Sequence, residues 1–192
     1  MIPFAYLLGT FPSALLVART KGIDITTSGS GNPGASNVSR VLGRKLGILV
    51  FVLDGLKGAL SVAAGFIAFE YAGALTLACA AVVGHVFPIT RKFKGGKGVA
   101  TAGGSMLALY PIVSLVLLLV WLTTVKLTKK ASLASLAITI GLPIGLLIVG
   151  QPGSEVLTTV GLAAFVIWRH WPNLKRLVHG DELSMKSRRS AD

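Results

Sequence analysis

Long apolar stretches separated by short polar segments dominate the hydrophobic pattern of this chain. They cover residues 2–18, 46–69, 72–89, 99–127, 133–149 and 156–168. A helix needs about 20 predominantly apolar residues to cross a bilayer. Inside the bilayer every backbone N–H and C=O must find a partner within the protein, which favours helices. The pattern therefore predicts an all-α polytopic membrane protein.

Composition supports this class. Of the 192 residues, 53% are hydrophobic and 14% are charged, whereas soluble domains carry about 25% charged residues. The first apolar stretch has no basic segment before it, and further stretches follow, so we expect a retained helix and not a cleaved signal peptide. The single cysteine, Cys79, lies inside an apolar stretch, which argues against a disulfide framework or a cysteine metal site.

The stretch 99–127 could cross the membrane once or twice. Lys and Arg follow the first and third stretches, residues 99–127 and the last stretch, and are missing from the connections near Glu70 and at 151–155. Because cytoplasmic loops collect Lys and Arg, two crossings that turn near Tyr110 and Pro111 place every basic loop on the cytoplasmic side. We therefore expect about seven transmembrane helices, the N-terminus outside, the C-terminus cytoplasmic, and a short or broken helix near 99–109. Residues 1–180 would form one transmembrane domain, and 181–192 a polar tail with the composition of a disordered segment.

The formal net charge of +12 would suit nucleic acid, anionic lipid or a phosphorylated substrate. Part of this charge follows from membrane topology alone. Nucleic acid is disfavoured, because the basic loops are short and the aromatic residues lie mostly in the apolar stretches.

The stretch GSGNPGASN (residues 29–37) contains the spacing G-x-G-x-x-G. A dinucleotide-binding turn needs a strand before it, and here the neighbours are membrane helices, so we disfavour that interpretation. Asn32 and Pro33 predict a helix start, with the helix running to about Leu42. Ser36 and Arg40 would then share a face and form an anion site at the helix start. An ordinary interfacial loop with a capped helix is the alternative.

The second glycine-rich stretch is KFKGGKGVAT, in which Gly95, Gly96 and Gly98 flank Lys97. It fails the P-loop pattern, because glycine and not Ser or Thr follows the lysine. A lysine among glycines at a helix start can still hold phosphate. Both glycine-rich stretches fall on the same predicted side of the membrane.

Three further features lie at or near that side, each with a purely structural alternative. His85 ends the third stretch, and could be a packing residue or a functional one. Asp54 and Lys57 are three apart in the second stretch and can form an ion pair. Arg169, His170, Asn173 and Arg176 recur at helical spacing, as an interfacial anchor or as part of a site.

Together these motifs resemble the bacterial membrane-integral acyl-phosphate:glycerol-3-phosphate acyltransferase family, PlsY. The resemblance rests on GSGNPGASN with Arg40, on KFKGGKGVAT and on RHWPNLKRL, and is supported by YLLGTFPSA, LDGLKG and KKASLAS. It implies transfer of a fatty acyl group from acyl phosphate to the 1-hydroxyl of glycerol 3-phosphate, giving lysophosphatidic acid and phosphate. Acyl-CoA and acyl carrier protein would not be donors. Ser36 stands where the family usually has Thr, and Trp171 and Pro172 where it usually has polar residues.

From the motifs and the resemblance we expect three catalytic residues, Arg40, His85 and Lys97. Arg40 and Lys97 would grip the phosphates. His85 would either hydrogen-bond the substrate or take the proton, and a substrate phosphate oxygen is the alternative base. The expected substrate-binding residues are Ser30, Gly31, Asn32, Gly34, Ser36, Asn37, Lys94, Gly95, Gly96, Gly98, Ser132, Asn173 and Arg176.

The chain lacks the H-x-x-x-x-D acyltransferase motif and a G-x-S-x-G elbow. We therefore expect direct attack in a ternary complex without an acyl-enzyme, and without cofactor or metal. The site would lie at the cytoplasmic face of the bacterial inner membrane. The competing hypotheses are a transporter of an organic phosphate and a lipid-binding scaffold.

Overall fold

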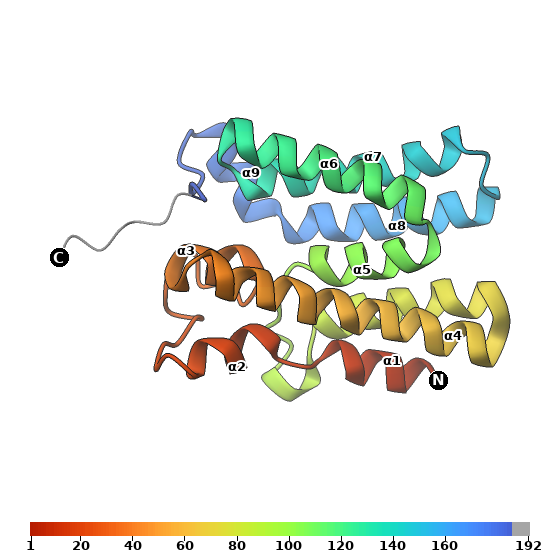
Figure 1. Ribbon diagram of the computed structural model, residues 1–192, viewed down its shortest axis with the longest axis horizontal. Coiled ribbons are helices and arrows are strands. Elements are labelled where there is room, and N and C mark those ends of the chain that lie inside the picture. Colours follow the sequence, from red (N-terminus) through yellow and green to blue (C-terminus); the bar gives the residue numbers. More distant parts are fainter. Residues whose placement is uncertain (186–192) are drawn as a thin grey trace. The chain divides into compact units, whose positions relative to one another are not determined.

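The computed structural model describes residues 1–185, apart from the side chains of residues 69, 70 and 72. These residues form only helices and loops, which fall into two compact units, residues 1–108 and 109–184. The first unit holds α1 (Ile2–Gly9), α2 (Ser13–Arg19), α3 (Ala35–Leu42), α4 (Arg44–Val86), the 3-10 helix η1 (Ile89–Arg91) and α5 (Val99–Leu109) (Figure 1). The second holds α6 (Pro111–Thr128), α7 (Ala131–Ile148), α8 (Gly153–Arg169) and α9 (Trp171–Val178). Most of the predicted tail, residues 186–192, lies outside the described residues.

The first apolar stretch is broken in its middle. α1 ends at Gly9, and α2 begins at Ser13. Pro12 has no N–H to donate and disfavours a helical conformation in the residue before it. The sequence predicts one continuous span here, because Thr10 and Pro12 interrupt an otherwise apolar run only briefly. The break leaves the Gly9 and Phe11 carbonyls open to a buried charged residue, Lys57.

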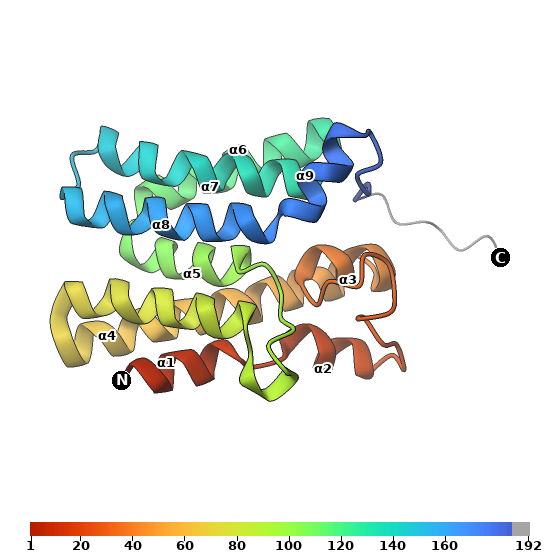
Figure 2. The same cartoon turned by 180° about the vertical axis from the view of Figure 1, so that it is seen from behind.

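α4 runs from Arg44 to Val86 and folds back on itself. In a straight helix residues 54 and 85 would lie about 46 Å apart along the axis, yet the Nδ1 atom of His85 lies 3.8 Å from the Oδ1 atom of Asp54. A side chain on Gly65 would collide with Ala74, so the turn is tight. Figure 2 shows the two arms of α4 lying antiparallel. The arms correspond to the predicted stretches 46–69 and 72–89.

Small residues bring the helices of the first unit into close contact. A Cβ on Gly9 would collide with the carbonyl of Ala81, and one on Gly84 with the carbonyl of Tyr6, where α1 crosses the second arm of α4. A Cβ on Gly104 would likewise strike the carbonyl of Gly55, where α5 crosses the first arm. Close approach over small residues is typical of helices that associate within membranes.

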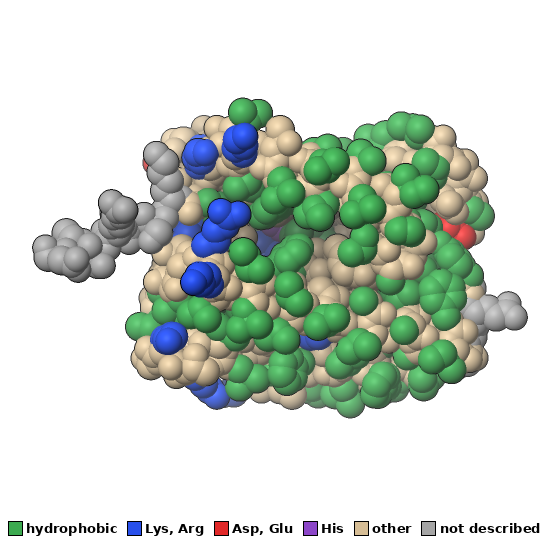
Figure 3. Space-filling view, viewed as in Figure 1, with side chains coloured by type: hydrophobic (Ala, Val, Ile, Leu, Met, Phe, Trp, Pro, Cys, Tyr) green, Lys and Arg blue, Asp and Glu red, His purple; other side chains and the backbone are tan. Residues whose placement is uncertain are grey.

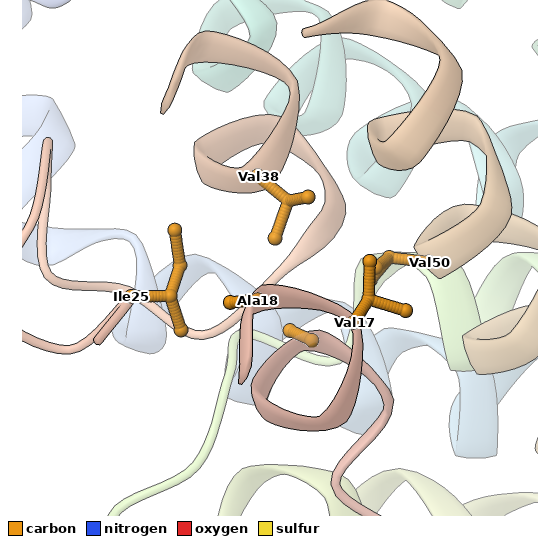
Figure 4. Packing of buried hydrophobic residues seen from close by; sticks show 6 residues of the cluster. Val17, Ala18, Ile25, Val38 and Val50 are labelled. Atoms are coloured by element: carbon orange, nitrogen blue, oxygen red, sulfur yellow. The ribbon is translucent and has the colours of Figure 1, made fainter. Parts of the chain in front are cut away.

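A compact apolar cluster supports the end of this unit that carries α2 and α3. Val17 and Ala18 of α2, Ile25 of the following loop, Val38 of α3 and Val50 of α4 pack together, all at least nine-tenths buried (Figure 4). Removing a Val or Ile side chain from water stabilises a fold by about 1.5–3 kcal/mol. The cluster fixes the loop 20–34 against α2 and α3.

In the second unit α6 packs on α7, α7 on α8, and α8 on α9. The chain enters α6 at Pro111, which occupies the first helical position. The predicted short helix near 99–109 has the bounds of α5, Val99–Leu109. At 11 residues it would span about 16 Å, roughly half of a hydrocarbon core.

Five segments of the described residues are long and apolar enough to cross a membrane: Ile2–Arg19, Arg44–Ala68, Gly73–Arg91, Pro111–Thr128 and Ala131–Ile148. In each unit hydrophobic side chains cover the helix surfaces, and Lys and Arg side chains gather near α2 and α3 in the first unit and near α9 in the second (Figure 3). Large exposed apolar side chains such as Ile67, Ile112 and Leu147 suit contact with lipid. The number of crossings and their direction stay predictions.

Candidate active site

Three buried polar side chains of α4 meet in the first unit. Lys57 Nζ lies 2.8 Å from Asp54 Oδ1 and 3.1 Å from His85 Nδ1. All three side chains are at least nine-tenths buried. The predicted pairing of Asp54 with Lys57 is confirmed, and the fold-back of α4 adds His85 to it. Because a buried charge needs a partner, Asp54 and His85 stabilise the buried Lys57 ammonium group through an ion pair and a hydrogen bond.

Lys57 also holds the break between α1 and α2. Its Nζ donates to the carbonyl of Gly9 at 3.2 Å and to that of Phe11 at 3.0 Å. Carbonyls at the end of a helix have lost their helical partners and carry partial negative charge, which attracts a cation. The break in the first span therefore supplies the carbonyl acceptors that the buried lysine needs. The sequence separates these partners by more than forty residues, so spacing could not predict the contact.

The hydrogen bond to Lys57 fixes the state of the His85 ring. An ammonium group only donates, so Nδ1 of His85 must accept and cannot carry a hydrogen. In the neutral ring the proton then lies on Nε2, which makes that atom a donor. A Cβ on Gly96 would collide with this same atom, so the ring edge faces the backbone of residue 96.

A small polar pocket opens beside this cluster, at the α1–α2 break. The 87–98 connection folds back over the break, as Figure 2 shows. The residues that line the pocket include Ser13, Pro33, Asp54, Lys57, His85, Arg91 and Gly96. Parts of both predicted glycine-rich motifs, Pro33 and Gly96, thus reach the pocket that holds His85.

The first glycine-rich loop is organised by Asn37. Its Oδ1 accepts from the Ser30 N–H at 2.8 Å, and its Nδ2 donates to the carbonyls of Ser28 and Ile25 at 2.9 and 3.2 Å. The side chain is 1% exposed. Asn37 was expected to bind substrate, and the structure places it inward, where it shapes the loop that carries Ser30.

The helix start in this loop differs from the prediction. α3 begins at Ala35 with Gly34 at the N-cap, and no side chain caps it, so the prediction that Asn32 caps a helix from Pro33 is wrong. A tight turn, in which the Gly34 N–H donates to the Asn32 carbonyl at 3.0 Å, intervenes. Earlier in the chain, before this loop, hydrogen bonds from the Thr26 side chain and backbone hold the pKa of Asp24 below its usual value.

The second glycine-rich loop folds onto the end of α4. The N–H groups of Gly95 and Gly96 donate to the carbonyls of Val86 and His85, at 3.1 and 3.2 Å. A side chain on Gly95 would collide with the same two carbonyls, which explains the glycine there. Gly98 has φ +86°, a conformation that favours glycine, and α5 starts directly after it.

The predicted cations of the first unit lie at different depths. Arg40 on α3 and Lys97 before α5 are half-buried, whereas Lys94 is exposed. Ser36, four residues before Arg40 on α3, is also half-buried, and Ser30 is exposed. The structure thus joins His85 and Gly96 in one pocket, and places Ser30, Ser36 and Arg40 on or near α3.

The second unit holds its own polar network, built around Glu182. Asn173 Nδ2 donates to Glu182 Oε1 at 2.7 Å, and Arg176 Nε donates to Oε2 at 2.8 Å. Burial raises the pKa of the Glu182 carboxyl, and donors from Asn173, Ser132 and Arg176 lower it by more, so the net pKa lies below its usual value. Ser132 Oγ is buried and forms no hydrogen bond within the usual distance and angle limits. It still lies close enough to Glu182 to favour the charged form of that carboxylate. Of the residues predicted here, Ser132, Asn173 and Arg176 are brought together.

His170 is a buried residue of this unit that the sequence-based assignment left out. It is 3% exposed, at the joint between α8 and α9. Its Nδ1 lies 2.8 Å from the Val166 carbonyl, which can only accept, so Nδ1 carries the hydrogen and a neutral ring keeps its lone pair on Nε2. The helical spacing of His170, Asn173 and Arg176 was the signal that could have identified it. Glu182 had no such signal, because it lies beyond the last helix.

No group of three His, Cys, Asp or Glu side chains is placed to hold a metal ion within the part of the chain that the structure describes. The polar groups described above are hydrogen-bond donors and cations, with one buried imidazole in each unit, His85 in the first and His170 in the second. Such groups can bind phosphate and stabilise developing negative charge.

Comparison with known proteins identifies the family. The model of the glycerol-3-phosphate acyltransferase family matches residues 1–180. The chain is 41% identical to glycerol-3-phosphate acyltransferase of Aquifex aeolicus (95% of this chain and 96% of the relative) and 43% identical to that of Bacillus velezensis (97% and 96%).

Solved structures agree. Two crystal structures of PlsY, an integral membrane glycerol 3-phosphate acyltransferase, match with TM-scores of 0.90 (glycerol 3-phosphate form, 40% identity) and 0.87 (lysophosphatidic acid form, 41% identity). Each match covers 95% of this chain and 92% of the other. The chain is thus an all-helical integral membrane protein and an acyltransferase enzyme. It belongs to the glycerol-3-phosphate acyltransferase family.

Proposed function

We propose that this enzyme transfers a fatty acyl group from acyl phosphate to the 1-hydroxyl of sn-glycerol 3-phosphate. The products are lysophosphatidic acid and phosphate, and the reaction is the first step of phospholipid synthesis. The family match over residues 1–180 carries this proposal. The PlsY structures named for a glycerol 3-phosphate form and a lysophosphatidic acid form support the acceptor and the product. The donor rests on the resemblance of the three motifs.

Side chains, more than backbone groups, would grip the phosphates. The N–H groups of Gly31, Gly34, Gly95 and Gly96 already donate to protein oxygens, so the glycines give the loops their shape. We assign phosphate binding to the guanidinium of Arg40, the ammonium groups of Lys94 and Lys97, and the side chains of Ser30, Asn32 and Ser36. Arginine and lysine are the usual phosphate-binding side chains.

Ser132, Asn173 and Arg176 would orient glycerol 3-phosphate. The Glu182 carboxylate accepts from Asn173 and Arg176 and fixes their positions on α9. Because a fixed side chain loses little further entropy on binding, this arrangement favours a precise acceptor position. His170, whose backbone carbonyl accepts from the Asn173 N–H at 2.8 Å, belongs to the same arrangement.

The glycerol hydroxyl would attack the acyl carbonyl directly, without an acyl-enzyme. Its proton needs an acceptor. Nδ1 of His85 already accepts from Lys57, and Nε2 of the neutral ring carries a hydrogen. We therefore assign the proton to a phosphate oxygen of the substrate, and to His85 the role of a donor that holds or polarises the substrate. Phosphate is a good leaving group and needs no general acid.

The site would face the cytoplasm in the bacterial inner membrane. The structure has five candidate spans, and seven crossings would require α5 and α8 to cross the membrane as well. The distribution of Lys and Arg among the loops supports an N-terminus outside. Single cysteines at Lys129 and Gln151 in a Cys79→Ser background test this orientation. A membrane-impermeant thiol reagent applied to intact cells should label the Gln151 position and spare the Lys129 position; the reverse would invert the topology.

An acylation assay on purified protein tests the donor. Labelled glycerol 3-phosphate is offered with palmitoyl phosphate, palmitoyl-CoA or palmitoyl carrier protein, without added metal. We expect lysophosphatidic acid from palmitoyl phosphate alone. Product from a thioester would overturn the donor assignment, and uptake of labelled glycerol 3-phosphate into sealed vesicles without any donor would instead indicate a transporter.

A further inference from the structure

One buried hydroxyl of the pocket at the α1–α2 break has no partner in the part of the chain described. Ser13 Oγ is buried, the residue is 1% exposed, and no described protein group forms a hydrogen bond with the hydroxyl. Leaving a buried hydroxyl unpaired is costly, so such groups are normally satisfied. Ser61 and Ser105 bond to the carbonyls four residues earlier, and Thr20 to the carbonyl three residues earlier.

At Ser13 the lack of a partner follows from the break in the first span. The carbonyl four residues before Ser13 is that of Gly9, and it accepts from Lys57. The Phe11 carbonyl accepts both from Lys57 and from the Ser13 N–H. Ser13 is the first residue of α2, so no preceding helical turn presents a carbonyl to its hydroxyl, which stays in the wall of the pocket.

The pocket carries surplus positive charge and has donors in Ser13 and Arg91. Lys57 and Arg91 line it against a single carboxylate, Asp54, which is paired with Lys57. Ser13 adds a hydroxyl, and His85 adds a ring whose Nδ1 accepts from Lys57. A group with several acceptor oxygens and negative charge is the complement of this lining. Because the neutral His85 ring has no lone pair left for activating a hydroxyl, Ser13 would serve as a donor and not as a nucleophile.

We propose that this pocket is a phosphate subsite of the enzyme, in which the Ser13 hydroxyl donates to a phosphate oxygen and Arg91 closes the rim. The proposal rests on the proposed function, since both acyl phosphate and glycerol 3-phosphate carry the phosphate that would bind. Pro33 and Gly96 connect the pocket to the two glycine-rich loops. The subsite adds two side chains, Ser13 and Arg91, to those that the motifs identify.

Steady-state kinetics with palmitoyl phosphate and glycerol 3-phosphate test the subsite. Ser13→Ala should raise KM for one of the two substrates by about tenfold, the effect of losing one hydrogen bond to a charged group, and Ser13→Thr should keep the wild-type KM. The substrate whose KM rises identifies the bound phosphate. Thr101→Val is the matched control, because Thr101 Oγ1 is also buried without a partner but does not line this pocket. Unchanged KM values for both substrates in Ser13→Ala would overturn the proposal.

A second measurement does not depend on turnover. Inorganic phosphate should raise the thermal unfolding midpoint of the wild-type protein in detergent, and should raise it less in Ser13→Ala and in Arg91→Gln. Equal shifts in all three would overturn the subsite even if the enzyme is active. If wild type makes no product from acyl phosphate but the phosphate shift depends on Ser13, the proposed donor is wrong and the subsite stands.

Discussion

The two units each bury a polar network, and the networks have opposite signs at their centres. In the first unit a cation, Lys57, contacts Asp54, His85 and two backbone carbonyls. In the second an anion, Glu182, accepts from Asn173 and Arg176. Both networks fix residues that the motifs assign to catalysis or binding, one through a membrane helix and the other through the segment after the last helix.

The surroundings of the two centres make them unequal. Lys57 is almost fully buried among partners on α1 and α4. Its loss would therefore leave the buried Asp54 carboxylate without a cation beside it. The Glu182 side chain is also buried, but its partner Arg176 has a side chain that is 33% exposed, so water can replace part of what Glu182 supplies to Arg176. We therefore expect substitutions in the first network to lower the stability of the fold strongly, and substitutions in the second network to lower it only slightly.

The largest effect is expected from Lys57→Met, which keeps the length of the side chain and removes its charge. Asp54 would be left as a buried carboxylate without its partner, and the Gly9 and Phe11 carbonyls would lose a donor. Breaking a buried ion pair in this way costs about 3–5 kcal/mol. The measurement is the thermal unfolding midpoint in detergent, together with the fraction of protein recovered as a single species.

The matched control is the double variant Lys57→Met with Asp54→Asn, which removes both charges. It should recover part of the loss, since the stranded carboxylate is gone. If the double variant is no more stable than the single one, the unpaired charge is not the cause, and the contacts with the α1–α2 break are.

The next effect concerns the packing of Gly96 against His85. In Gly96→Ala the added methyl would collide with the ring at Nε2, so the ring or the loop must move, at about 1–3 kcal/mol. We expect kcat/KM to fall by about tenfold to a hundredfold. Gly103→Ala is the control, because an added Cβ there meets nothing within 4 Å, and alanine favours a helix by about 0.5–1 kcal/mol. Equal activity in the two variants would mean that the ring position is not critical.

These networks also mark the limit of what the sequence predicts. Apolar stretches identify helices because burial in lipid imposes length and composition, and the spacing of Asp54 and Lys57 identifies a pair because a helix puts residues three apart on one face. The contact of Lys57 with the Gly9 carbonyl depends on the fold-back of α4, which no local signal encodes. Asn37 looks like a ligand in the motif and instead holds the loop, because an amide bonds to backbone as readily as to substrate.

Removing the charge of the second centre should have a smaller effect. Glu182→Gln keeps an acceptor for Asn173 and loses the charge that attracts Arg176, so we expect a loss of about 1 kcal/mol. The pKa of Glu182 is lowered in the folded protein. Its contribution to stability is therefore complete above the unfolded pKa of about 4.3 and is lost as the pH falls through the lower folded value.

Unfolding midpoints measured between pH 7 and pH 3 check this linkage. Wild type should lose more stability than Glu182→Gln on acidification, so that the difference between the two proteins shrinks as the pH falls. A constant difference over the whole range would mean that the Glu182 charge contributes nothing and that only the shape of the side chain matters.

The smallest effect is expected from His85→Gln, and it separates the two possible bases. Glutamine can accept from Lys57 through its Oε1 and donate through its Nε2, as the neutral His85 ring does, but it cannot take a proton at neutral pH. If the substrate phosphate is the base, kcat should fall by less than about tenfold, whereas loss of a general base costs about a hundredfold or more. His85→Ala, which removes both hydrogen-bonding roles, should be the more damaging substitution. A hundredfold fall in kcat in His85→Gln with an unchanged unfolding midpoint would identify His85 as the general base. The hydrogen bond from Lys57 to Nδ1 would then have to break during the reaction.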